Sequence, residues 1–135
     1  TEWSTGYFYE GVACYNIEDY QKTIELLKDL EVRGAGYGPL LTLIMAYIKT
    51  EKREKALLLS KQMKGEEGVF SQAIIKATLG EFDSALSLLK RNEYWGYWEV
   101  LALHHFYPKE LGPIRNSEDF KNIVKKAKLS WKWEE

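Results

Sequence analysis

The sequence predicts an all-α fold, and three observations support this prediction. Apolar residues recur at intervals of three and four along most of the chain, which is the spacing of one face of an α-helix. Short polar or glycine-containing links separate these stretches. No stretch alternates between apolar and polar residues with period two, as a half-buried strand would. With 45% apolar and 14% aromatic residues, the 135 residues suffice for one core, so we expect a single domain over residues 1–135.

The first helical hairpin is expected over about residues 3–32. Its first helix covers Trp3–Tyr15, with Gly11 as a point of close approach between backbones. Cap-like residues follow in Asn16–Asp19 and start the second helix. Four apolar residues of that helix share one side: Tyr20, Ile24, Leu27 and Leu30.

The second hairpin is expected over about residues 38–64. Two apolar-periodic segments, Pro39–Lys49 and Arg53–Met63, are joined by the polar link Thr50–Lys52. Pro39 suits the first position of a helix, where a missing N–H costs no hydrogen bond.

A third hairpin is expected over about residues 68–91. Lys64–Gly68 is read as a link, followed by a helix over Val69–Leu79 that Gly80 ends and a helix over Ser84–Lys90. A C-terminal cap is expected over about residues 95–135. It begins with a helical stretch that starts near Tyr94 and ends at Pro108. Ser117 is expected to cap the last helix, whose apolar face contains Phe120, Ile123, Val124 and Ala127.

The C-terminal segment from Gly112 to Trp133 has two interpretations. It closes the open end of the helical stack, with Trp131 and Trp133 extending the cover. Alternatively, its lysine-rich helix stands free and contacts an acidic partner or a membrane surface.

The hairpins repeat with a period that narrows the fold class. Ala13 and Ala46 lie 33 residues apart, as do Thr23 and Ala56, whereas Ala56 and Ala85 lie 29 apart. Leu79–Leu86 carries the glycine, aromatic and small residues that resemble the turn of the tetratricopeptide family, whose period is about 34 residues. This resemblance implies an α-solenoid of about three hairpins plus capping helices.

The ending of the chain carries a second resemblance. The segment Leu111–Phe120 with Ile123–Lys126 after it is similar to the end of tetratricopeptide regions in bacterial transcription regulators and nucleotide cyclases. This resemblance implies that the chain is the C-terminal interaction part of a larger bacterial signalling or transcription-regulatory protein. It leaves open that the chain is the regulatory arm of an enzyme whose catalytic domain lies elsewhere. The absence of an initial methionine is taken as a sign of a fragment.

The resemblance also implies a binding surface, because the first helix of each hairpin lines the concave side of a tetratricopeptide groove. A protein or peptide partner is therefore expected in this groove. The alternative is that a shift of one helical step puts some of these residues in the core. The groove set is Phe8, Val12, Tyr15, Asn16, Leu41, Met45, Ile48, Lys49, Phe70 and Ile74, with Tyr9 as a further candidate.

No catalytic or cofactor site is expected. His104 and His105 are adjacent, so on a helix they point about 100° apart and do not face one metal ion. Cys14 has no base near it in the sequence and is read as a small core residue. No glycine-rich phosphate loop is present. We therefore expect no enzyme activity, no cofactor and no metal.

Charge and hydropathy limit the classes of partner that are expected. The net charge of −1 gives no general attraction to nucleic acid, and no apolar run reaches the roughly 20 residues of a membrane span, so neither partner is expected. A single cysteine fits a reducing compartment such as the cytoplasm. Residues 1–33 hold seven acidic and three basic residues, whereas residues 49–64 hold six basic and two acidic. Either these charges attract copies into a weak homo-oligomer, or they are solvated helix faces.

Overall fold

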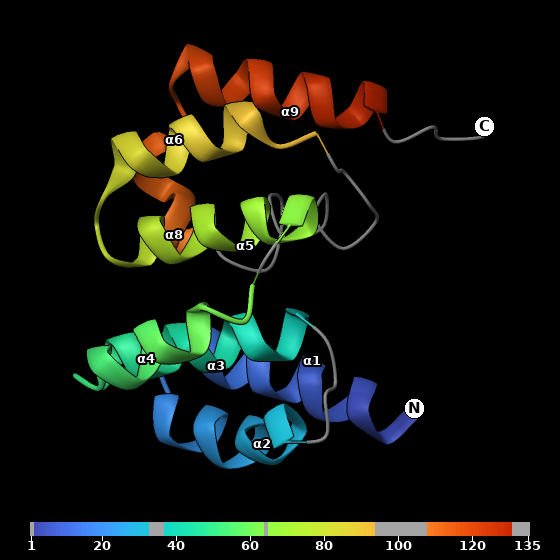
Figure 1. Ribbon diagram of the computed structural model, residues 1–135, viewed down its shortest axis with the longest axis vertical. Helices are drawn as coiled ribbons and strands as arrows, with labels where there is room; N and C mark the ends of the chain where they lie inside the picture. Colours follow the sequence, from blue (N-terminus) through green and yellow to red (C-terminus); the bar gives the residue numbers. More distant parts are fainter. Residues whose placement is uncertain (1, 33–36, 64, 94–107, 131–135) are drawn as a thin grey trace. The chain divides into compact units, whose positions relative to one another are not determined.

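The protein is all-α in a computed structural model that describes residues 2–32, 37–63, 65–93 and 108–130 (Figure 1). No strand occurs in these ranges. Their elements are α1 (Glu2–Asn16), α2 (Tyr20–Val32), α3 (Tyr37–Lys49), α4 (Arg53–Ser60), α5 (Gly65–Thr78), α6 (Phe82–Arg91), α8 (Pro108–Leu111), the 3₁₀ turn η2 (Gly112–Ile114) and α9 (Glu118–Ser130).

The chain divides into two compact units, unit 1 over Thr1–Met63 and unit 2 over Lys64–Glu135. The single domain expected from the sequence stays a prediction. Unit 1 contains the two hairpins α1–α2 and α3–α4. Helix α2 packs against both α1 and α3, and α4 packs against α3. Helix α3 therefore lies at the centre of unit 1.

Helices α1 and α2 cross closely at Gly11, as the sequence predicted. A Cβ atom at this buried position would lie 2.8 Å from Cγ of Leu27, a residue with no exposed surface. The Thr23 hydroxyl, also fully buried, donates hydrogen bonds to the carbonyls of Gly11 (3.3 Å) and Asp19 (3.1 Å). The absence of a side chain at Gly11 thus lets the two helices approach, so that the Thr23 hydroxyl of α2 reaches the Gly11 carbonyl of α1.

The turns of the three hairpins have the same backbone structure. In each, one residue adopts a left-handed conformation: Glu18 (φ 67°), Glu51 (φ 62°) and Gly80 (φ 81°). These residues are 33 and 29 positions apart, which are the spacings found in the sequence. Each second helix begins two residues later, at Tyr20, Arg53 and Phe82.

Equivalent hydrogen bonds close the three turns. The residue that follows the left-handed one donates its N–H to the carbonyl of the residue five positions earlier in the chain than itself. These bonds join Asp19 to Cys14 (2.9 Å), Lys52 to Tyr47 (2.8 Å) and Glu81 to Lys76 (2.9 Å). The left-handed residue donates to the carbonyl three residues before it, which completes a Schellman motif in every turn. The repeat is therefore present in the backbone as well as in the sequence.

We expect Glu51→Gly to stabilise the protein by about 1 kcal/mol, because a side chain is unfavourable in the left-handed conformation and glycine is not. Gly80→Ala should destabilise by a similar amount, although nothing lies within 4 Å of its Cβ position, because only the backbone conformation opposes it. Urea denaturation measures both. The control is Glu54→Gly in the exposed first turn of α4, which should destabilise. If Glu51→Gly also destabilised, the left-handed turn would be refuted.

Unit 2 combines the third hairpin, α5–α6, with α8, η2 and α9. Helix α9 packs against α6, and Lys90 Nζ lies 2.9 Å from Asp119 Oδ2 across this pair. Ser117 caps α9 as predicted, because its Oγ accepts a hydrogen bond from the Phe120 N–H (3.1 Å). The predicted apolar face is also confirmed: Phe120, Ile123 and Ala127 are buried and Val124 is half-buried. This helix is therefore folded onto unit 2 rather than free.

Two predicted boundaries differ from the structure. Lys64–Gly68 is not a link throughout, because α5 already begins at Gly65. Helix α4 ends at Ser60 rather than at Met63. A glycine in the first turn of a helix costs no intrahelical hydrogen bond, so Gly65 did not mark a break. The stretch from Tyr94, the two histidines, Trp131 and Trp133 lie outside the described residues.

Candidate functional site

Most of the predicted groove residues are buried in the structure. In unit 1, Leu41 and Met45 have no exposed surface, as does Ile74 in unit 2. The others are exposed by 8% or less: Phe8, Val12, Tyr15 and Phe70. Every residue from Pro39 to Tyr47 is buried, so α3 is covered on all sides over this range. This burial favours the core interpretation for these side chains.

The other predicted groove residues lie where the first helices end. Ile48 and Asn16 are half-buried, and Lys49 is exposed. Tyr9, the further candidate, is 50% exposed. These side chains are accessible, but they do not form a continuous apolar groove with the buried members of the set.

Exposed apolar side chains lie elsewhere on unit 1. On α1 and the turn after it, Tyr7, Tyr9 and Ile17 are 42%, 50% and 75% exposed. On α4, Leu57 and Leu58 are 40% and 64% exposed. Single exposed apolar residues are common on protein surfaces, and only a contiguous apolar patch would by itself indicate a site where proteins meet.

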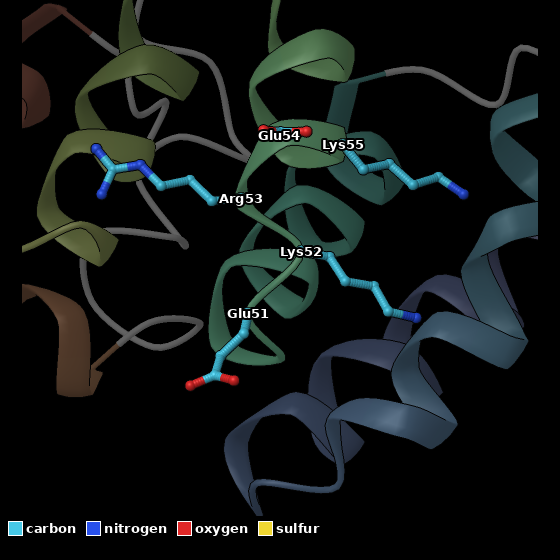
Figure 2. A pocket seen from close by; sticks show the side chains of 5 residues that line it. All are labelled: Glu51, Lys52, Arg53, Glu54 and Lys55. Atoms are coloured by element: carbon cyan, nitrogen blue, oxygen red, sulfur yellow. The ribbon is translucent and has the colours of Figure 1, made fainter.

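An open depression of about 450 Å³ lies over the turn before α4 and its first residues. It is lined by Glu51, Lys52, Arg53, Glu54 and Lys55, all exposed. Figure 2 shows these side chains spreading apart, with Lys52 and Lys55 on one side and Glu51 and Arg53 on the other. Lys55 Nζ lies 4.9 Å above the Tyr47 ring, a cation–π contact. Exposed charges that diverge bind water, and they do not assemble around a reacting group.

A second open depression, of about 410 Å³, lies in unit 2. Lys76 of α5 contributes to it together with residues of α6, and its Nζ lies 3.3 Å from Glu81 Oε1. Both partners are more than one-third exposed, so this pair contributes little stability. The α6 residues that line the depression are Asp83, Ser84, Ser87, Leu88 and Arg91.

Cys14 is buried in α1, as the sequence predicted. Desolvation raises the pKa of its thiol, and the nearby Asp19 and Glu10 carboxylates act in the same direction, whereas Lys22 opposes them. The reactive thiolate is therefore scarce at neutral pH.

We expect iodoacetamide to alkylate Cys14 at least about tenfold more slowly in the native protein than in denaturant, because the native thiol is both covered and protonated. Raising the pH above the ordinary cysteine pKa ionises the unfolded state first, so it should also lower the free energy of unfolding slightly. Mass spectrometry of timed samples measures the labelling rate. Equal rates in both states would show that Cys14 is accessible.

Within the described ranges, no three histidine, cysteine or acidic side chains group together as metal ligands. No helix in the same part of the chain is long and apolar enough to cross a bilayer. The chain matches no protein-family model, and neither a curated protein nor a solved structure is significantly similar to it.

Proposed function

We propose that this chain is a non-catalytic interaction module built as a helical solenoid of the tetratricopeptide kind. The observation that supports it is the repetition of one turn, with one left-handed residue and one pair of closing hydrogen bonds, in three successive hairpins. Hairpins that repeat in this way stack side by side and produce extended surfaces that bind other proteins. The tetratricopeptide resemblance of Leu79–Leu86 agrees with this reading.

The partner is a protein segment with apolar anchors. Unit 1 exposes aromatic and aliphatic side chains beside charged ones, a combination that suits a partner with both apolar and polar groups. The module serves a larger signalling or transcription-regulatory protein, as the resemblance of its C-terminal segment implies.

Selection from a displayed library of peptide segments tests this function. The immobilised 135-residue chain should enrich related sequences that contain apolar anchors, and titration calorimetry should give Kd values of about 1–100 μM for them. Scrambled versions of the enriched peptides are the control. A library that yields no enriched sequence, or peptides that bind equally well after scrambling, would contradict the proposed function.

A further inference from the structure

One face of α1 is exposed, although the equivalent face of α3 is buried. A shift of 33 residues places Tyr9 and Ala13 of α1 on Thr42 and Ala46 of α3. Thr42 and Ala46 have no exposed surface, whereas Tyr9 is 50% exposed and Ala13 is exposed as well. The same positions of the repeat are therefore covered in the second hairpin and open in the first.

The exposed face of α1 points away from α2. A Cβ atom at Gly11 would contact Leu27 of α2, so Gly11 lies on the side of α1 that faces α2. Tyr9 and Ala13 are each two positions from Gly11, which is about 200° around the axis of an α-helix. By the same register, the equivalent residues of α3 point away from α4, so within unit 1 the hairpin α1–α2 covers them. The open face of α1 thus corresponds to a surface on which helices pack one repeat later.

The apolar residues of this face are neighbours along α1. Tyr9, Ala13 and Ile17 follow one another at intervals of four positions, and Ile17 is 75% exposed. Ile17 continues the helical hydrogen bonding, because its N–H donates to the carbonyl of Ala13 (3.1 Å). The Tyr9 ring centroid lies 5.4 Å from that of Phe8, which is buried and supports the exposed ring. The face is therefore contiguous, with an aromatic side chain that can serve as an anchor.

The charge around this face indicates the class of partner. Helix α1 contains two glutamates and no lysine or arginine, and Glu10, the residue after Tyr9, is exposed. Glu18 and Asp19 in the turn after α1 are exposed too. A second copy that presented the same face would bring like charges together, whereas a basic partner would bring unlike charges together. The charge therefore favours a basic partner.

We propose that this face of α1 binds an amphipathic helix of a partner protein, with basic residues beside the apolar stripe of that helix. This inference rests on the proposed interaction function and deepens it by naming the surface and the class of partner. The partner helix covers α1 as the hairpin α1–α2 covers α3. Tyr9 is the apolar anchor, and Glu10 selects for basic residues.

Fluorescence anisotropy of the full chain with labelled peptides of about 18 residues tests this inference. The basic probe has leucine and alanine at helical spacing and lysine and glutamine at the other positions. In the acidic probe glutamate replaces every lysine, and the scrambled probe keeps the composition of the basic probe without its helical spacing. The basic probe should bind at least about tenfold more tightly than either of the others, and high salt should reduce its advantage over the acidic probe.

Two substitutions test whether the basic probe binds at α1. Ala13→Arg places a long cation on the exposed face, and Tyr9→Ser removes the aromatic anchor. Each should weaken binding of the basic probe at least about tenfold. Asn122→Arg, which adds the same charge on the exposed side of α9, should bind the probe like the wild type. Unchanged melting temperatures establish that the variants are folded.

Equal affinity for the basic and acidic probes, or an unchanged affinity after Ala13→Arg, would overturn the inference. So would sedimentation velocity in which the wild type self-associates and the Ala13→Arg chain does not, because the occupant of the face would then be a second copy. Failure of the proposed function would be distinct, because the displayed library would enrich no sequence. Enriched peptides that bind the Ala13→Arg chain as tightly as the wild type would contradict the α1 site alone.

Discussion

Met45→Glu is expected to unfold unit 1. Met45 has no exposed surface and lies in α3, the helix that packs against α1, α2 and α4. An unpaired buried carboxylate costs roughly 3–5 kcal/mol, and loss of the thioether packing adds about 2–5 kcal/mol. The sum is comparable with the whole stability of a small domain, about 5–15 kcal/mol. Circular dichroism should show a large loss of helical signal at room temperature.

Lys49→Glu is the matched control, because it introduces the same side chain one turn later on the same helix. Lys49 is exposed, so its substitution should change stability by no more than about 0.5 kcal/mol. The pair also separates the two interpretations of the sequence. A Met45→Glu protein that melts at the same temperature as the wild type would show that Met45 lies in an open groove and not in the core.

Gly11→Ala is expected to destabilise the protein, although alanine is the better helix former. The new methyl group would lie 2.8–2.9 Å from three atoms of the Leu27 side chain, which is fully buried. Overpacking of this kind costs about 1–3 kcal/mol, more than the gain of about 1 kcal/mol from replacing a helical glycine. Chemical denaturation followed by far-UV circular dichroism measures the net loss.

Gly6→Ala provides the comparison within the same helix. Gly6 is exposed and nothing lies within 4 Å of its Cβ position, so only the helix-propensity gain of up to about 1 kcal/mol applies. The two substitutions should therefore shift the denaturation midpoint in opposite directions. Equal stabilisation by both would mean that α1 and α2 do not approach closely at Gly11. Partial recovery of Gly11→Ala by Leu27→Val would confirm the steric cause.

The repeat and its turns could be predicted from the sequence because they depend on local patterns. Apolar spacing located the helices, and the 33- and 29-residue spacings agree with the left-handed residues Glu18, Glu51 and Gly80. The cap of α9 followed from one short motif, Ser117 to Phe120, whose hydrogen bond is local. Glycine is unnecessary at the left-handed position of these turns, because the backbone hydrogen bonds hold glutamate there as well.

The sequence predicted less well which residues are buried and which are exposed. Helix α3 is apolar on nearly every side from Pro39 to Tyr47, so periodicity alone could not tell a buried face from a groove face. Tyr7 and Leu57 lie at the edges of wider apolar stripes, where a rotation of one residue changes burial to exposure. The exposure of Tyr9 on α1 and the burial of Thr42 on α3 depend on which helices pack against each of these two helices. Such tertiary information is absent from the spacing of residues in one helix.

The identical turns also affect how a hairpin can be added to or removed from such a chain by duplication or deletion. A segment cut after Glu18 and after Glu51 begins and ends at the same point of the same backbone motif, so a tandem duplication of residues 19–51 joins its copies through a turn that already exists. No new loop has to be invented at the junction. The shorter 29-residue interval to Gly80 accompanies a short α4 of 8 residues, against 13 in α2. In these two hairpins, the difference in length therefore lies in the second helix. A single recombination event between two turns is therefore sufficient to add or remove one complete hairpin.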